Sequence, residues 1–267
     1  MAETDGRDTE KVLGEALEHF RAGRHGECES LCREVPSGDT VQNAEALHLL
    51  GTALDAQGRY DEALDHYARA VALLGPDSPG GIGAEVNRAP ALVLAGRYGE
   101  GWDSYERRLD LPDFLPPFDL PPRWDGEPLE GRSILVHDEQ GIGEIIMFAT
   151  CLPDLMATGA RISLHCDPRL ESLLARSFPE IRVVGHHGQR LEGVKPGDAD
   201  FSLPMGSLPR YFRRHETDFP QRNSILRADP AKTATWRKRF AEMGPGIKIG
   251  TAWSGGVTAW DKWRRTT

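Results

Sequence analysis

The first hundred residues carry apolar and small side chains at the spacing of amphipathic helices. Within residues 44–77 this pattern runs once, stops at a Gly-Arg-Tyr turn at 58–60, and then begins again. Apolar positions that recur every three to four residues line one face of an α-helix, and glycine is typical just past a helix end. Small residues at Gly51, Ala63 and Ala70 would let the two helices approach closely. The pattern predicts a helical hairpin.

The same turn recurs at 22–24 and at 95–98, which predicts three hairpins within residues 11–109. They resemble the tetratricopeptide repeat, a helix-turn-helix unit of about 34 residues whose copies stack into an α-α superhelix. The concave face of such a superhelix commonly binds peptides, so the resemblance implies a groove for a protein or glycan acceptor. A packing module without a ligand is the alternative. The residues that depart from the repeat pattern are Cys28 and Cys32 in the first copy and Pro90 and Gly101 in the third.

A proline-rich stretch at 110–131 has no sustained periodicity and predicts an extended linker between two domains. It also contains Phe114, Phe118 and Trp124, which are more aromatic residues than a free linker needs. We therefore expect these rings to pack along the domain that follows.

Runs rich in β-branched and apolar residues alternate with helical runs over residues 132–243. The expected strands are 133–137, 161–166, 181–184 and 200–205, and the expected helices are 144–158, 169–177 and 231–242. Strands that alternate with helices are typical of a parallel, doubly wound sheet. The expected fold class is thus an α-α superhelix followed by a Rossmann-like α/β domain. A further strand at 247–253 would begin an incomplete second domain, residues 244–267.

Composition and charge disfavour several classes of partner and of site. The net charge of -9 disfavours a nucleic-acid partner, and we expect the basic segment 209–222 to be a surface loop with salt pairs rather than an RNA contact. The apolar stretch 145–152 is far shorter than the roughly 20 residues of a membrane helix.

Residues 1–10 are acidic and polar, unlike a signal peptide, so we expect a frayed terminus and a cytoplasmic protein. Cys28 and Cys32 lack a second ligand pair at zinc spacing, so we expect core-facing thiols and no metal.

The turn formed by Gln140, Gly141 and Gly143 after the first expected strand is the main candidate site. Glycines there let the backbone approach a ligand, and the next helix would point its N-terminus at it. A dinucleotide fingerprint would need a third glycine, but that position is Ile146. Glu144 opens the helix, where a carboxylate can accept a proton from a substrate hydroxyl. The alternative is an ordinary first-turn acid that is stabilised by the helix dipole.

A resemblance to a known family rests on the runs AGRYGEGWDSYERRL, WDGEPLEGRSILVHDEQGIGEIIMFATCLPDLMATGARISLHCDPRLESLL and IGTAWSGG. The long run resembles the start of the glycosyltransferase-like region that follows tetratricopeptide repeats in many bacterial proteins. That region is related to the family 9 heptosyltransferases and, more distantly, to O-linked N-acetylglucosamine transferases. The resemblance implies the GT-B fold, in which two Rossmann-like domains face each other. The first domain usually holds the acceptor and the second the nucleotide sugar.

The resemblance also implies roles for three residues. In the heptosyltransferases the glycine loop ends in an aspartate that is the proposed general base, and Glu144 is the matching residue here. The second domain of the family carries a basic residue after its first strand, and either Lys262 or Arg265 matches it. Such a cation would neutralise the departing diphosphate. The alternative is a solvated basic tail.

These features predict the acceptor-side half of a nucleotide-sugar-dependent glycosyltransferase, with the nucleotide sugar as substrate and no cofactor. A donor domain of ordinary size needs far more chain than residues 244–267 supply, so we expect this chain to be truncated and inactive by itself. The alternative is a tetratricopeptide-repeat scaffold that binds other proteins and has no catalytic activity.

Overall fold

The computed structural model describes residues 2–111, 114, 119–186, 191–221 and 224–251, which form two compact units. The helical unit contains Met1–Leu115 together with Arg213–Phe219. The sheet unit contains Pro116–Phe212 and Pro220–Ser254. Among the described residues, no helix combines the length and the apolar character needed to cross a bilayer.

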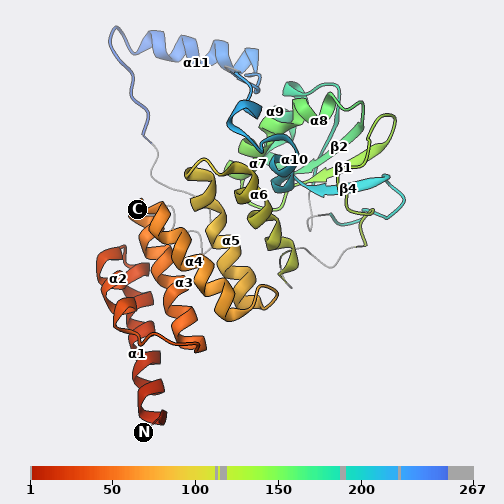
Figure 1. The fold of residues 1–267 in the computed structure, drawn as a ribbon. Coiled ribbons are helices and arrows are strands. Elements are labelled where there is room, and N and C mark those ends of the chain that lie inside the picture. Colours follow the sequence, from red (N-terminus) through yellow and green to blue (C-terminus); the bar gives the residue numbers. More distant parts are fainter. Residues whose placement is uncertain (1, 112–113, 115–118, 187–190, 222–223, 252–267) are drawn as a thin grey trace. The chain divides into compact units, whose positions relative to one another are not determined.

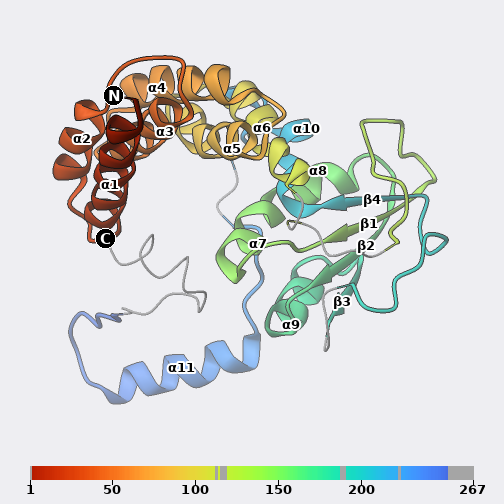
Figure 2. The same cartoon turned by 90° about the horizontal axis from the view of Figure 1, so that it is seen from below.

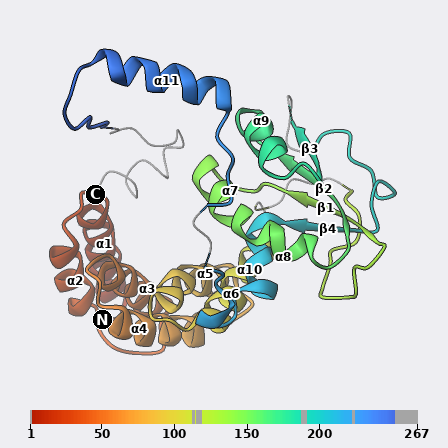
Figure 3. The ribbon, with the colours of Figure 1, turned by 90° about the horizontal axis from the view of Figure 1, so that it is seen from above.

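Three pairs of adjacent helices build the helical unit (Figure 1). The pairs are α1 (Ala2–Arg21) with α2 (His25–Glu34), α3 (Val41–Ala56) with α4 (Tyr60–Leu74), and α5 (Pro79–Leu94) with α6 (Tyr98–Glu106), which a 3-10 turn, η1 (Arg107–Asp110), continues. Neighbouring pairs also contact each other, and the helices follow one curved row (Figure 2, Figure 3). The three predicted hairpins are confirmed.

One backbone conformation closes all three hairpins. The turn glycines are Gly23, Gly58 and Gly96, with φ of 74°, 76° and 77°. Glycine adopts such positive values at no steric cost. The arginine that follows each glycine donates its backbone N–H to the carbonyl five residues earlier, at 2.9, 3.0 and 2.9 Å. The recurring Gly-Arg pair is therefore the local device that ends one helix and begins the next.

Three details of the helical unit differ from what the sequence pattern suggests. The first helix begins at Ala2, inside the stretch expected to fray, because extending an existing helix gains a backbone hydrogen bond for each residue. The fifth helix runs through Pro90 without a break. Gly101 lies so close to that helix that a Cβ would come within 2.6 Å of Val93 Cγ2, so alanine would not fit here without a shift. Cys28 and Cys32 are buried in the core, as predicted.

A buried carboxylate joins the first hairpin to the turn of the second. Glu29 on α2 is 7% exposed. Arg59 Nη1 donates to both of its oxygens at 2.7 and 2.9 Å, and Gln57 Nε2 donates to Oε2 at 2.9 Å. Arg33 also pairs with it. Burial raises the pKa of Glu29, but the hydrogen bonds from Gln57 and Arg59 outweigh burial and hold that pKa below its ordinary value. The fold therefore favours the ionised carboxylate.

We expect Glu29→Gln to lower the free energy of unfolding by about 1–2 kcal/mol near neutral pH, because Arg59 and Arg33 lose their shared partner. Since folding lowers the pKa of Glu29, this stabilisation is complete above the unfolded-state pKa of about 4.3 and is lost as the pH falls through the folded-state value. Denaturant unfolding at about pH 7 and about pH 3 measures both effects. The control Glu62→Gln removes an exposed partner of Arg59 and is expected to leave the free energy of unfolding nearly unchanged. Equal losses in the two variants would contradict the role given to Glu29.

A four-stranded parallel sheet in the order β3-β2-β1-β4 forms the centre of the sheet unit (Figure 2). Its strands are β1 (Ser133–His137), β2 (Arg161–Cys166), β3 (Arg182–Gly185) and β4 (Phe201–Pro204). The helices α7 (Ile142–Phe148) and α8 (Leu152–Met156) connect β1 to β2, and α9 (Pro168–Ser177) connects β2 to β3. Strand β4 then pairs with the free side of β1. The predicted parallel α/β sheet is confirmed.

The expected helix over 144–158 is divided into α7, a 3-10 turn η2 (Ala149–Cys151), and α8. Pro153 has no N–H to donate to the preceding turn, and it lies in the first turn of α8, a position that proline favours. Near the end of the described chain, α11 (Pro230–Glu242) forms as predicted, but residues 247–251 form no strand. No neighbouring strand pairs with these residues in the described part of the chain. An isolated strand lacks the backbone partners that stabilise it.

The linker aromatics do not all pack where the sequence suggests. Trp124 is buried in the sheet unit, where its Nε1 donates to the Glu127 carbonyl at 2.8 Å and its ring lies 4.3 Å from that of Tyr211. The prediction is correct for this residue. Phe114 belongs instead to the helical unit, 5.5 Å from the guanidinium of Arg108, because a buried cation there offers it a partner. Phe118 lies outside the described residues.

Candidate functional site

The carboxyl ends of the four strands form the edge at which a parallel sheet usually binds its ligand. The chain leaves β1 toward β2 and β3, and then returns to β4 on the opposite side of β1. In open α/β sheets this reversal leaves a crevice beside the carboxyl end of the first strand. The loop after β1 and the 3-10 turn η3 (Met205–Ser207) after β4 flank that position, and α7 contacts η3.

The sequence-predicted residues of the glycine turn lie together where the loop after β1 enters α7, with Gln140 and Gly141 in the loop and Gly143 and Glu144 in the first turn of the helix. Gly141 is the N-cap of α7, with φ -81° and ψ 173°, and its carbonyl accepts a hydrogen bond from the N–H of Ile145 at 3.1 Å. Gly143 is exposed, and a Cβ there would meet nothing within 4 Å. Gln140 and Glu144 are half-buried on either side of the turn. Because α7 has only seven residues, its helix dipole by itself does not make an anion site.

A carboxylate and an imidazole that the sequence did not single out as a site meet at the same edge. Asp138 follows β1 directly, and His186 follows β3 directly. His186 Nε2 lies 3.0 Å from Asp138 Oδ2. The Asp138 side chain is 2% exposed and that of His186 is 19% exposed. The one local signal was an acidic residue directly after a buried strand.

The groups around this pair are held in defined charge states. Hydrogen bonding to Arg169 lowers the pKa of Asp167 to about 2, so that carboxylate stays ionised. Burial, together with the charges of Arg182 and His186, lowers the pKa of His165. Burial, together with the carboxylate of Asp138, raises the pKa of the Cys166 thiol to about 12. A thiol with that pKa is protonated at neutral pH, so Cys166 is not a nucleophile here.

The structure does not test the other predicted site residues. Lys262 and Arg265 lie outside the described residues. No group of three or more histidine, cysteine or acidic side chains in the described ranges is arranged to hold a metal ion.

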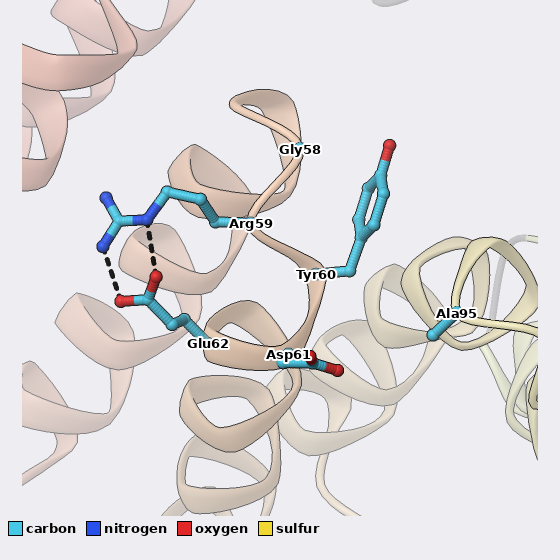
Figure 4. Close-up of a pocket in the computed structure, with 6 residues that line it drawn as sticks. All are labelled: Gly58, Arg59, Tyr60, Asp61, Glu62 and Ala95. Atoms are coloured by element: carbon cyan, nitrogen blue, oxygen red, sulfur yellow. Dashed lines mark hydrogen bonds and ion pairs between the residues drawn. The ribbon is translucent and has the colours of Figure 1, made fainter.

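The helical unit has an open depression of about 500 Å³ between its second and third turns. It is lined by Gly58, Arg59, Tyr60, Asp61, Glu62 and Ala95. Figure 4 shows that Arg59 and Glu62 face each other on one side, whereas Tyr60 extends away from them. The lining is polar, its main cation is already paired, and the depression is open, unlike the enclosed and mostly apolar pockets that bind small molecules.

The basic segment at 209–222 contributes to packing. Its central part, Arg213–Phe219, belongs to the helical unit. Trp102 Nε1 donates to the Arg213 carbonyl at 2.9 Å, and Arg214 Nη2 pairs with Asp103 Oδ2 at 2.8 Å. The Tyr98 and Phe219 rings lie 4.9 Å apart. The expected salt pairs are present. The expectation of a surface loop is only partly correct, because the segment begins in the short helix α10 (Leu208–Phe212) and Arg213 is buried.

Comparison with known proteins identifies the repeats. Residues 13–75 match the family model described as tetratricopeptide repeat, which confirms that part of the prediction. The chain is 34% identical over 198 residues to Protein FlbA of Caulobacter vibrioides, across 68% of this chain and 33% of that protein. It therefore spans about a third of the length of this relative. A mutant O-GlcNAc transferase of Thermobaculum terrenum is 21% identical, with a TM-score of 0.37, over 68% of this chain and 42% of that chain.

Proposed function

We propose that this chain supplies the acceptor-side lobe of a nucleotide-sugar-dependent glycosyltransferase with a GT-B arrangement. The observation that carries the proposal is the composition of the carboxyl edge of the sheet. A glycine turn and a carboxylate–imidazole pair occur there together, in a chain whose preceding helices are tetratricopeptide repeats. The repeats would select a protein or glycan acceptor, and a second lobe would bind the nucleotide sugar.

The reaction needs one proton acceptor on this lobe. The acceptor hydroxyl oxygen attacks the anomeric carbon, the bond from that carbon to the phosphate oxygen breaks, and the nucleoside diphosphate leaves with the bonding electrons. The hydroxyl proton has to pass to a basic group within hydrogen-bond reach. Glu144 and His186 are the two candidates at this edge. Lys262 or Arg265 would neutralise the departing diphosphate.

Turnover by the full-length protein tests the proposal. A panel of nucleotide sugars is incubated with the protein and with candidate acceptors, and release of nucleoside diphosphate and mass gain of the acceptor are measured. We expect one donor to bind and to be consumed only when acceptor is present. Binding of an acceptor peptide without binding or consumption of any donor would refute the catalytic function.

Glu144→Gln separates the two candidates for the proton acceptor. If the Glu144 carboxylate takes the proton, the neutral amide lowers kcat by about 100-fold or more while the fold is kept. If Glu144 only stabilises the start of α7, turnover persists and stability falls by about 0.5 kcal/mol. Measurements of kcat and of thermal unfolding on the same preparation distinguish these outcomes.

The second candidate function is a binding scaffold without catalysis. The tetratricopeptide match and the open depression between the turns favour it. A pull-down with the whole chain tests this function, with Tyr60→Ala as the variant and Glu10→Ala as a control far from the depression in sequence. A partner that is lost with the first variant and kept with the second supports the scaffold.

A further inference from the structure

The link between Asp138 and His186 crosses the end of an intervening strand. The backbone N–H of Asp138 donates to the carbonyl of His165 on β2 at 3.0 Å. The backbone N–H of His186 donates to the carbonyl of Cys166 on the same strand at 3.1 Å. Both residues are therefore fixed at the backbone, and their side chains meet at 3.0 Å. The sheet itself determines this geometry.

In a proton-accepting pair, the base must reach the substrate, whereas the carboxylate that orients it can be buried. The exposures of the two side chains fit these roles. Asp138 is too buried to touch a substrate, whereas the imidazole of His186 is partly open. A buried carboxylate requires a hydrogen-bond donor, so the proton of the neutral imidazole belongs on Nε2, which faces Asp138. The lone pair is then on Nδ1, and no hydrogen bond to Nδ1 is made by any other described residue. A carboxylate that selects one tautomer and orients the ring is the usual support for a histidine base.

We infer that His186, positioned by Asp138, is the group that takes the proton from the acceptor hydroxyl. This inference rests on the proposed function. As the hydroxyl oxygen bonds to the anomeric carbon, its proton passes to Nδ1. The resulting imidazolium is stabilised by the carboxylate at Nε2 and returns the proton to water after the nucleoside diphosphate has left.

Neighbouring groups are less suited to this step. The Asp167 carboxylate is paired with Arg169 at 2.8 Å, and its low pKa makes it a weak base. The Cys166 thiol is buried and protonated. Asp138 is a positioning residue, because it acts through His186.

The hydrogen bond can be tested without turnover. In the ¹⁵N-labelled chain, we expect a downfield proton signal on His186 Nε2 that exchanges slowly with water. Asp138→Ala should abolish this signal, while a control variant outside the sheet unit, His215→Ala, should leave it in place. A wild-type ring whose proton is on Nδ1 would overturn the inference.

Turnover by the full-length protein tests the catalytic step. His186→Ala is expected to lower kcat by at least about 100-fold, and added imidazole should restore part of the rate. His186→Gln serves as a second variant, and both are compared with wild type by circular dichroism. Full activity of both variants in a protein that transfers sugar would overturn the inference and leave the proposed function standing. A wild-type protein that transfers no sugar to any acceptor would overturn the proposed function, and the inferred proton transfer with it.

Discussion

Tyr67→Ala is expected to lower the free energy of unfolding of the helical unit by about 3–5 kcal/mol, the usual cost of emptying a buried aromatic site. Tyr67 is fully buried on α4, and its ring lies against the backbone of Gly51 on α3, where a Cβ would come within 3.0 Å of the ring carbons. It shares a core cluster with Phe20 and Cys28 of the first hairpin. Removing the ring thus opens a cavity between two hairpins, and denaturant unfolding followed by far-UV circular dichroism measures the loss.

Tyr67→Phe is the matched control, because it keeps the ring and removes only the hydroxyl. That hydroxyl donates to Thr52 Oγ1 at 3.2 Å, a neutral hydrogen bond worth about 1 kcal/mol. The two variants should therefore differ by at least about 2 kcal/mol. If Tyr67→Ala cost no more than Tyr67→Phe, the ring would not be the element that holds the two hairpins together.

The hairpins could be predicted from the sequence because their information is local. A Gly-Arg turn depends on one positive φ and one hydrogen bond spanning five residues, and helix faces depend on spacings of three and four. The strands of the sheet were also recognisable from their composition. By contrast, the position of Phe114 depends on what packs around it. Local patterns do not carry that information.

The glycine-turn part of the candidate site could be predicted from the sequence, whereas the pair of Asp138 and His186 could not, because only the first depends on local pattern. Gln140, Gly141 and Glu144 are neighbours in the chain, so one motif contains them all. Asp138 and His186 are 48 residues apart, and they meet only because β2 lies between β1 and β3. Strand order is a property of the whole sheet. A histidine that follows a strand therefore gives no sign in the sequence of which carboxylate it will reach.

Gly185→Val is expected to destabilise the sheet unit by about 3 kcal/mol, because a side chain there has no room. Gly185 is the last residue of β3, and a Cβ would lie 2.6 Å from Glu171 Oε2 and 3.0 Å from the Cα of Pro168. The carboxylate can swing away, but the backbone at the start of α9 cannot, so α9 and β3 must separate. The next residue is His186, and a displacement of about 1 Å at a catalytic group can cost about 100-fold in rate.

Gly197→Val is the control for this prediction, because a Cβ at that exposed position meets nothing within 4 Å. We expect the control to keep both the stability and the Nε2 proton signal of His186, and Gly185→Val to lose both. If Gly185→Val lost stability but kept the signal, the sheet would have rearranged elsewhere and left the hydrogen bond between Asp138 and His186 in place. Both properties retained in Gly185→Val would mean that α9 and β3 leave more space than their contacts indicate. The close approach of α9 to the end of β3 thus connects the packing of the sheet to the position of the imidazole.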